Sequence, residues 1–144
     1  MCAEAEQCLD YRALYEDFKK FTPRKRMTQM ETLASSAVAT TLTLQVDLII
    51  VMSDSGKMAR YVAKYKPSVP ILAATTDFIV FKNLSVVRGV IPFEIKDEDK
   101  DMKRLIEKAQ QMNLVKGPCK IITLLEADSR DYSTASELNI VDVE

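Results

Sequence analysis

Hydrophobic residues near the N-terminus recur every three or four positions, with charged residues between them. They are Ala5, Leu9, Ala13, Leu14 and Phe18. Because positions three and four apart share one face of a helix, this spacing predicts an amphipathic helix over 3–20. Thr22-Pro23 ends it, since proline has no backbone N–H to donate. We interpret the basic residues at 24–26 as a solvated connector.

A second helical stretch begins at a capping signal. Thr28 and Glu31 form the Thr-x-x-Glu pattern of a capping box, ahead of a mostly apolar run that predicts a helix over 29–45. Small side chains at 34–39 would allow another backbone to approach closely. We interpret this helix as packing against a sheet or another helix, within one chain or between two.

From residue 47 onward, short aliphatic and β-branched runs alternate with helical segments. The runs typical of strands are 47–52, 71–74, 85–91, 119–125 and 138–143, with Pro92 closing the third. Helices are expected over 55–65, over 78–84, and from the acidic residues 97–99 to Met112. This alternation predicts an α/β sheet with helices on both faces. The last run alternates apolar and polar residues, as a half-buried edge strand does.

Length and charge narrow the class of protein. A chain of 144 residues with net charge −1 predicts one domain and shows no basic footprint for nucleic acid. The longest uncharged stretch, Thr32 to Val46, is shorter than the roughly 20 apolar residues of a membrane-spanning helix. The acidic N-terminus lacks the apolar region of a secretory signal. We therefore predict a cytoplasmic domain without a nucleic-acid or membrane partner.

Residue types that carry catalysis are scarce. The chain has no histidine, so the commonest general base is missing. Cys2, Cys8 and Cys119 match no zinc-ligand spacing, and we interpret them as reduced thiols. No sequence motif singles out a pair of carboxylates or lysines as a general acid and base. We therefore predict neither catalytic nor metal-binding residues.

The segment Ser53-Asp54-Ser55-Gly56-Lys57 lies between a predicted strand and a predicted helix. Ligands of α/β sheets gather at the carboxyl ends of strands, and a helix N-terminus there favours an anion. The serine hydroxyls, the flexible glycine and the lysine suit a phosphate, whereas Asp54 opposes one. Serine and glycine also cap ordinary helices, and neither the P-loop nor G-x-G-x-x-G is present. A phosphate site and a plain capping turn both remain open.

Five motifs, read in order, resemble the C-terminal domain of pyruvate kinase. The resemblance runs from the first residues to about Ile95 and weakens beyond it. The motifs are CAEAEQCLDY at 2–11, METLASSAV at 30–38, DLIIVMSDSGKMAR at 47–60, YKPSVPILAAT at 65–75 and RGVIP at 88–92. Their family counterparts include S-G-x-x-A-R, Y-R-P-x-x-P-I-x-A-x-T and R-G-V-x-P.

The resemblance implies a three-layer α/β/α domain with a five-stranded mixed sheet whose last strand is antiparallel. It implies one unit over 1–144, with an N-terminal helix in 1–22, a connector at 23–27 and the α/β core over 28–144. The parent enzyme transfers phosphate from phosphoenolpyruvate to ADP with Mg²⁺ and K⁺, on a catalytic barrel. Because the chain begins inside the first motif of this domain, we expect a fragment or a one-domain product, inactive alone and without a cofactor of its own.

In the family this domain contributes a subunit interface, and in many members it binds a sugar bisphosphate. The resemblance places one phosphate on Ser53, Asp54, Ser55 and Gly56, with Lys57 and Met58 at the helix start. The second belongs to the loop before the last strand, here EADSRDYSTAS at 126–136, where Arg130 is the candidate. This loop has three acids and no glycine, which disfavours wrapping a dianion.

Three functional hypotheses follow from these residues. In the first, the loop at 53–58 binds a phosphorylated effector or phosphate, and the domain self-associates and serves the catalytic barrel of its parent chain. In the second, the effector site is degenerate and the domain is a scaffold for assembly. In the third, the chain is a small independent enzyme acting on a phosphorylated substrate.

Overall fold

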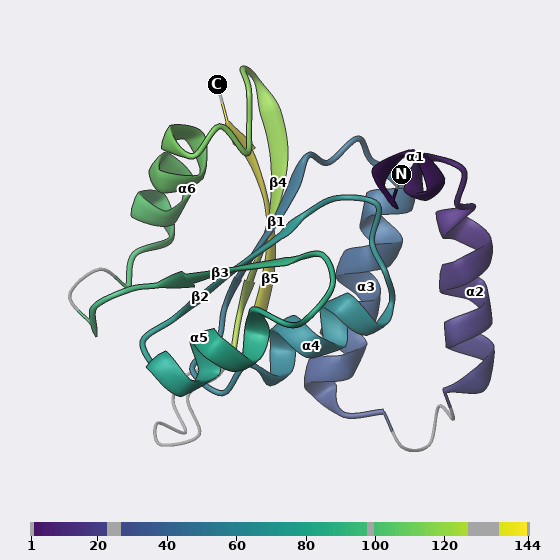
Figure 1. Cartoon of the computed structure of the whole chain (residues 1–144), viewed down its shortest axis with the longest axis horizontal. Helices are drawn as coiled ribbons and strands as arrows, with labels where there is room; N and C mark the ends of the chain where they lie inside the picture. The colour runs from purple at the N-terminus through teal and green to yellow at the C-terminus, as the bar shows by residue number, and fades with distance from the viewer. Residues whose placement is uncertain (1, 23–26, 98–99, 127–135, 144) are drawn as a thin grey trace.

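A computed structural model of the chain describes residues 2–22, 27–97, 100–126 and 136–143 (Figure 1). Its centre is a five-stranded sheet in the order β3-β2-β1-β4-β5. The strands are β1 (Leu48–Met52), β2 (Ile71–Thr75), β3 (Val90–Glu94), β4 (Cys119–Leu125) and β5 (Glu137–Val143). The first four pair in parallel, and β5 runs antiparallel to β4 at one edge. The expected mixed sheet with an antiparallel last strand is confirmed.

Helices lie on both faces of the sheet, so the three-layer arrangement is also confirmed (Figure 1). The helices are α1 (Cys2–Gln7), α2 (Tyr11–Phe21), α3 (Gln29–Thr43), α4 (Lys57–Lys64), α5 (Phe78–Leu84) and α6 (Met102–Gln111). One face packs against α3, α4 and α5, and α2 lies outside α3. The other face packs against α6. Within β1, Ile49 and Val51 point to the first core and Leu48 and Ile50 to the second, as the alternation of strand side chains requires.

The small residues of α3 allow close packing inside the domain. Ala34 and Ala37 are fully buried, and α3 lies against α4. Thr28 caps the helix by accepting a hydrogen bond from the Glu31 backbone N–H at 3.2 Å. The Glu31 carboxylate has another partner, because its Oε1 accepts from Lys64 Nζ at 2.6 Å and from the Tyr65 hydroxyl at 3.3 Å. The capping box is therefore half formed, and its acid ties α3 to the end of α4.

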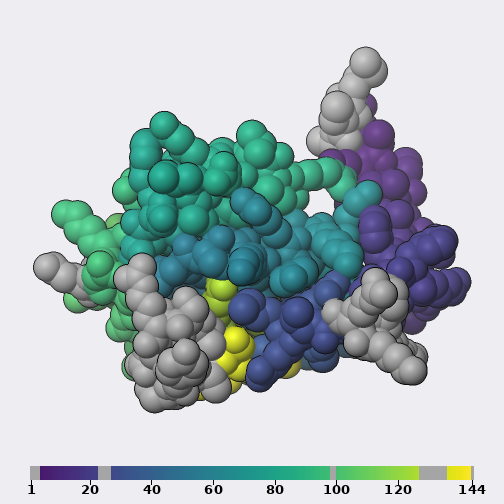
Figure 2. Space-filling model, turned by 90° about the horizontal axis from the view of Figure 1, so that it is seen from below, coloured from purple at the N-terminus to yellow at the C-terminus, as the bar shows by residue number. Residues whose placement is uncertain are grey.

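The single helix expected over 3–20 is wrong, because the segment forms two helices. Asp10 accepts hydrogen bonds from the backbone N–H groups of Arg12 and Ala13, both at 3.1 Å, and so starts α2 as a new helix. The apolar spacing continues across the break, which is why periodicity alone did not reveal it. The predicted connector at 24–26 lies outside the described residues. In Figure 2 the purple N-terminal helices form one end of the molecule.

The third strand was predicted too early in the chain. It spans Val90–Glu94 instead of 85–91, and Pro92 lies inside it, in register with Ala73. Pro92 is tolerated because β3 is an edge strand, where a missing backbone N–H leaves no ladder bond unmade. Gly89, with φ of +78°, makes the turn into the strand.

The start of the last helix is also corrected. Asp101 is its N-cap, accepting from the Lys103 backbone N–H at 3.0 Å, so α6 begins after the acidic residues that we expected to start it. Residues 98 and 99 lie outside the described residues, and Asp97 forms an ion pair with Lys100. Within the described ranges, no helix has the length and apolar character needed to cross a membrane.

Candidate functional site

The candidate phosphate loop lies where β1 ends and α4 begins. Ser53 extends the sheet by donating its backbone N–H to the Ala74 carbonyl at 3.0 Å. Gly56 is the N-cap of α4 and has φ of +72°, a conformation that side chains disfavour. A Cβ on Gly56 would lie 2.8 Å from Cγ1 of Val80 on α5. The glycine therefore serves the turn and the close approach of α5, whether or not a ligand binds.

Two serine hydroxyls in this loop converge on one carboxylate. The backbone N–H of Gly56 donates to Ser53 Oγ at 2.8 Å, and that of Lys57 donates to Ser55 Oγ at 3.2 Å. Both hydroxyls then donate to Glu126, Ser53 to Oε2 and Ser55 to Oε1. The first turn of α4 thus reaches an anionic group through two oriented hydroxyls, which is the donor arrangement of an oxyanion receptor.

The parallel pairing of β1 and β4 explains how these groups meet. Met52 is in register with Leu125, so the residues that follow each strand leave the same edge of the sheet. The Glu126 backbone N–H also donates to the Met52 carbonyl at 3.0 Å. In Figure 2, seen from below Figure 1, yellow-green atoms near the end of β4 lie against blue-green atoms of the β1–α4 region. Residues far apart in the chain therefore form one surface.

Asp54, which opposed a phosphate on sequence grounds, has its own partners. Its Oδ1 accepts from the Thr76 hydroxyl at 3.1 Å, and its Oδ2 forms an ion pair with Lys100 Nζ at 3.0 Å. The hydrogen bond to Asp54 raises the pKa of Lys100 above its ordinary value. A lysine from the segment before α6 therefore offsets the charge of Asp54 at the rim of the loop.

The structure brings together only part of the predicted site. Ser53, Ser55 and Gly56 lie in one turn, and Lys57 is exposed at the first position of α4. The Met58 side chain is fully buried in the core, so only its backbone faces the loop. Arg130 lies outside the described residues.

Sequence reasoning missed three partners of the loop, Glu126, Thr76 and Lys100. Glu126 was counted among the acids of its own loop, and its position directly after a predicted strand was a usable signal. Thr76 likewise follows a strand at the carboxyl edge of the sheet. No local feature of the sequence distinguishes Lys100 from other lysines.

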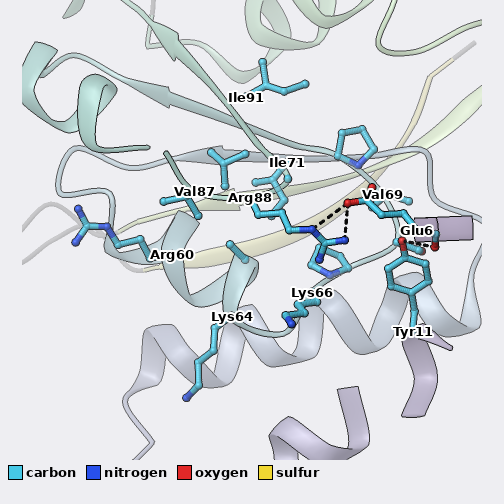
Figure 3. Close-up of a pocket in the computed structure, with 16 residues that line it drawn as sticks. Glu6, Tyr11, Arg60, Lys64, Lys66, Val69, Ile71, Val87, Arg88 and Ile91 are labelled. Carbon is cyan, nitrogen blue, oxygen red and sulfur yellow. Dashed lines mark hydrogen bonds and ion pairs between the residues drawn. The ribbon is translucent and has the colours of Figure 1, made fainter. Parts of the chain in front are cut away.

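A second hollow lies at the opposite, amino-terminal edge of the sheet. This pocket of about 690 Å³ is lined mainly by the segments 66–71 and 87–91, which hold two of the motifs noted above. Glu6 accepts from Arg88 Nε at 3.0 Å and Nη2 at 2.7 Å, and this bonding raises the pKa of Arg88 (Figure 3). Figure 3 shows Arg60 and Lys64 directed away from that pair. Arg60 and Lys64 therefore do not converge with Arg88 on a common point.

Across the residues that the structure describes, no group of three or more His, Cys, Asp or Glu side chains is placed to hold a metal ion. Cys8 is exposed and Cys119 is buried, and both are free thiols.

Comparison with known proteins gives the same assignment by three routes. A family profile described as "Pyruvate kinase, alpha/beta domain" matches residues 31–141. Pyruvate kinase of Dictyostelium discoideum is 38% identical over 128 residues, covering 85% of this chain and 25% of that protein. The cytosolic isozyme of Solanum tuberosum is 35% identical, covering 83% of this chain and 27% of that protein. The structure of Cryptosporidium parvum pyruvate kinase in complex with ADP matches with a TM-score of 0.84 and 26% identity, covering 99% of this chain and 28% of that one.

The fold and its loop define a three-layer α/β/α domain of the kind that forms one part of a larger kinase. The chain belongs to the pyruvate kinase family, and it corresponds to the C-terminal domain. The family match extends to residue 141, so the resemblance continues well beyond Ile95, where sequence motifs became hard to follow. The chain spans about a quarter of the length of the curated relatives named above.

Proposed function

We propose that this chain is a regulatory and assembly unit of a pyruvate kinase, with an anion site for a phosphorylated effector at the 53–57 loop. One observation carries the proposal. The hydroxyls of Ser53 and Ser55, each oriented by a backbone N–H of the α4 start, already hold both oxygens of a carboxylate. A phosphate offers the same kind of acceptor oxygens to the same donors.

Two lysines lie beside the loop, and the Glu126 carboxylate is the negative charge whose position an anion would take. Lys100 pairs with Asp54 and also with Asp97, and Lys57 is exposed at the start of α4. The positive end of the α4 dipole adds to their field. For a sugar bisphosphate, we propose that Arg130 assists the second phosphate, as the resemblance implies.

Titration calorimetry on the full chain tests the anion site. Fructose 1,6-bisphosphate, fructose 2,6-bisphosphate and inorganic phosphate are the ligands. We expect Ser55→Asp to abolish binding, because a second carboxylate replaces a donor, and Lys57→Ala to weaken it by about tenfold. Lys116→Ala, an exposed lysine before β4, is the matched control and should bind like the original chain. Equal binding by all four proteins would contradict the assignment of the site.

Catalysis is proposed to reside elsewhere in the parent enzyme. The relatives are named pyruvate kinases, and this chain covers about a quarter of their length. One relative is named a cytosolic isozyme, which supports a cytoplasmic location. We therefore expect no turnover from the pure chain with phosphoenolpyruvate, ADP, Mg²⁺ and K⁺ in a coupled assay for pyruvate. Turnover that persists after repurification would refute this part of the proposal.

A scaffold role without effector binding is the second candidate function. Occupation of both serine hydroxyls by Glu126 favours it, since a site filled by its own chain needs no ligand. Assembly through this domain predicts a dimer in light scattering at tens of micromolar protein. A species of 16.3 kDa under those conditions would count against self-association of the chain alone.

A further inference from the structure

We propose that Glu126 is a built-in competitor of the effector, holding the anion position of the 53–57 loop until its side chain rotates away. The inference rests on the proposed anion site and adds a regulatory contact to it. Its basis is that Glu126 accepts from both serine hydroxyls of the loop at once, one on each carboxylate oxygen. The loop is therefore complete without a ligand.

A phosphate and the Glu126 carboxylate compete for the same two serine hydroxyl protons. A serine hydroxyl has one proton to donate, and here each hydroxyl accepts from a backbone N–H and gives its proton to Glu126. A phosphate on the loop needs the same two protons, so it and the carboxylate cannot both be bound there. Repulsion between a carboxylate and a phosphate dianion acts in the same direction.

Only the side chain of Glu126 has to move to release the serines, because its backbone stays paired with β1. The Glu126 N–H is bonded to the Met52 carbonyl, which continues the pairing of β4 with β1 beyond Leu125. The Glu126 side chain is only partly buried, so a change of side-chain rotamer can release the serines while the strand stays paired. We call the contact of Glu126 with Ser53 and Ser55 the latch, and it opens by a rotation of the Glu126 side chain alone.

Glu126 is distinguished from the neighbouring acid Asp54 by what it contacts. Asp54 bonds Thr76 and Lys100, whereas Glu126 bonds the two serines that a phosphate would use. Removal of either charge lowers the repulsion of an anion, but only removal of Glu126 frees the donors. Asp54→Asn is therefore the matched control for Glu126→Gln and Glu126→Ala.

The experiment titrates inorganic phosphate into the full chain at constant ionic strength and follows the amide resonances of Gly56 and Lys57. We expect Glu126→Ala to tighten phosphate binding by at least about tenfold, because two charge-assisted hydrogen bonds no longer compete. Glu126→Gln should give a smaller gain, since its amide oxygen can still accept from one serine. Asp54→Asn should change the affinity by less than about threefold.

A second measurement uses no ligand. Thermal unfolding of Ser55→Ala, Glu126→Ala and the double variant forms a double-mutant cycle. We expect the double variant to lose clearly less in melting temperature than the sum of the single losses, because both changes remove the same bond. Additive losses would overturn the latch.

The outcomes separate the inference from the function on which it rests. If the original chain binds phosphate as tightly as Glu126→Ala, the latch is refuted and the anion site stands. If neither protein binds phosphate at millimolar concentration, both are refuted. Tighter binding in Glu126→Ala than in Asp54→Asn, with a non-additive cycle, supports the latch. Should Glu126→Ala fail to fold, Glu126→Gln is compared with Asp54→Asn instead, with the smaller expected gain.

Discussion

Acidic side chains are held differently at the carboxyl edge of the sheet, where its parallel strands end, and at the amino edge, where those strands begin. At the carboxyl edge, Glu126 is held by serine hydroxyls that backbone N–H groups orient. At the amino edge, Glu6 is held by the guanidinium of Arg88 across a pocket rich in basic side chains. The amino edge has more positive charge, but Lys64 and Arg88 are already paired with acids, and Arg60 points away from the Arg88–Glu6 pair (Figure 3). Donor orientation, more than the number of cations, marks the candidate anion site.

The largest expected loss of stability comes from the turn between β1 and α4, at the carboxyl edge of the sheet. Gly56→Ala should destabilise the protein by about 2–4 kcal/mol, because a side chain is disfavoured at this φ and its Cβ would collide with Val80. Gly117→Ala is the matched control, since Gly117 has the same φ of +72° with open space around it. We expect it to cost only about 1–2 kcal/mol. Urea unfolding measures both, and equal losses would show that contact with α5 contributes nothing.

An intermediate effect is expected where α3 meets α4. Glu31→Gln should lower the free energy of unfolding by about 1–2 kcal/mol, because buried Glu31 loses its charge-assisted bond to Lys64. Urea unfolding at neutral pH measures the loss. Glu107→Gln, an exposed acid on α6, is the control and should leave the free energy of unfolding almost unchanged.

The same pair predicts a dependence of stability on alkaline pH. The hydrogen bond to Glu31 raises the pKa of Lys64, and burial raises the pKa of Tyr65. Stability from a group whose pKa is raised on folding is complete below its unfolded pKa, about 10 here, and is lost as pH rises through the folded value. We expect stability to fall above about pH 10, with a shallower fall in Glu31→Gln. Parallel curves for the two proteins would contradict the assignment of Lys64.

The smallest effect is expected at the amino edge. Arg88→Ala should destabilise less than Glu31→Gln, since both members of the Arg88–Glu6 pair are about half exposed and solvent screens them. The loss should disappear in 1 M salt. Phosphate affinity should be unchanged, which separates the two edges directly. A tenfold loss of phosphate affinity in this variant would move the candidate anion site to the pocket.

Local patterns predicted the elements that have clear ends. Cys119–Leu125 follows the Gly117-Pro118 turn, and Phe78–Leu84 follows the capping residue Asp77, so both elements have the predicted bounds. The strand expected at 85–91 failed because Val86, although β-branched, is exposed outside the sheet. Its place is taken by a segment containing Pro92, which only the edge position allows.

The sequence predicted the residues of the 53–57 loop as a site, but it did not predict their partners Glu126 and Lys100. Ser53, Ser55 and Gly56 are neighbours in the chain, so their convergence at the start of a helix follows from local sequence. The contact with Glu126 depends on the register of β1 with β4, and the contact of Asp54 with Lys100 depends on the path of the chain before α6. The position of Glu126 directly after a predicted strand is the one local signal for the first pairing, and no local signal indicates the second, because tertiary packing decides both.

The most direct test of the regulatory account is a crystal structure of Glu126→Ala with fructose 1,6-bisphosphate. The account predicts one phosphate on the hydroxyls of Ser53 and Ser55 and on the backbone N–H groups at the start of α4. A ligand seated beside Arg88 in the amino-edge pocket, with the 53–57 loop empty, would contradict it.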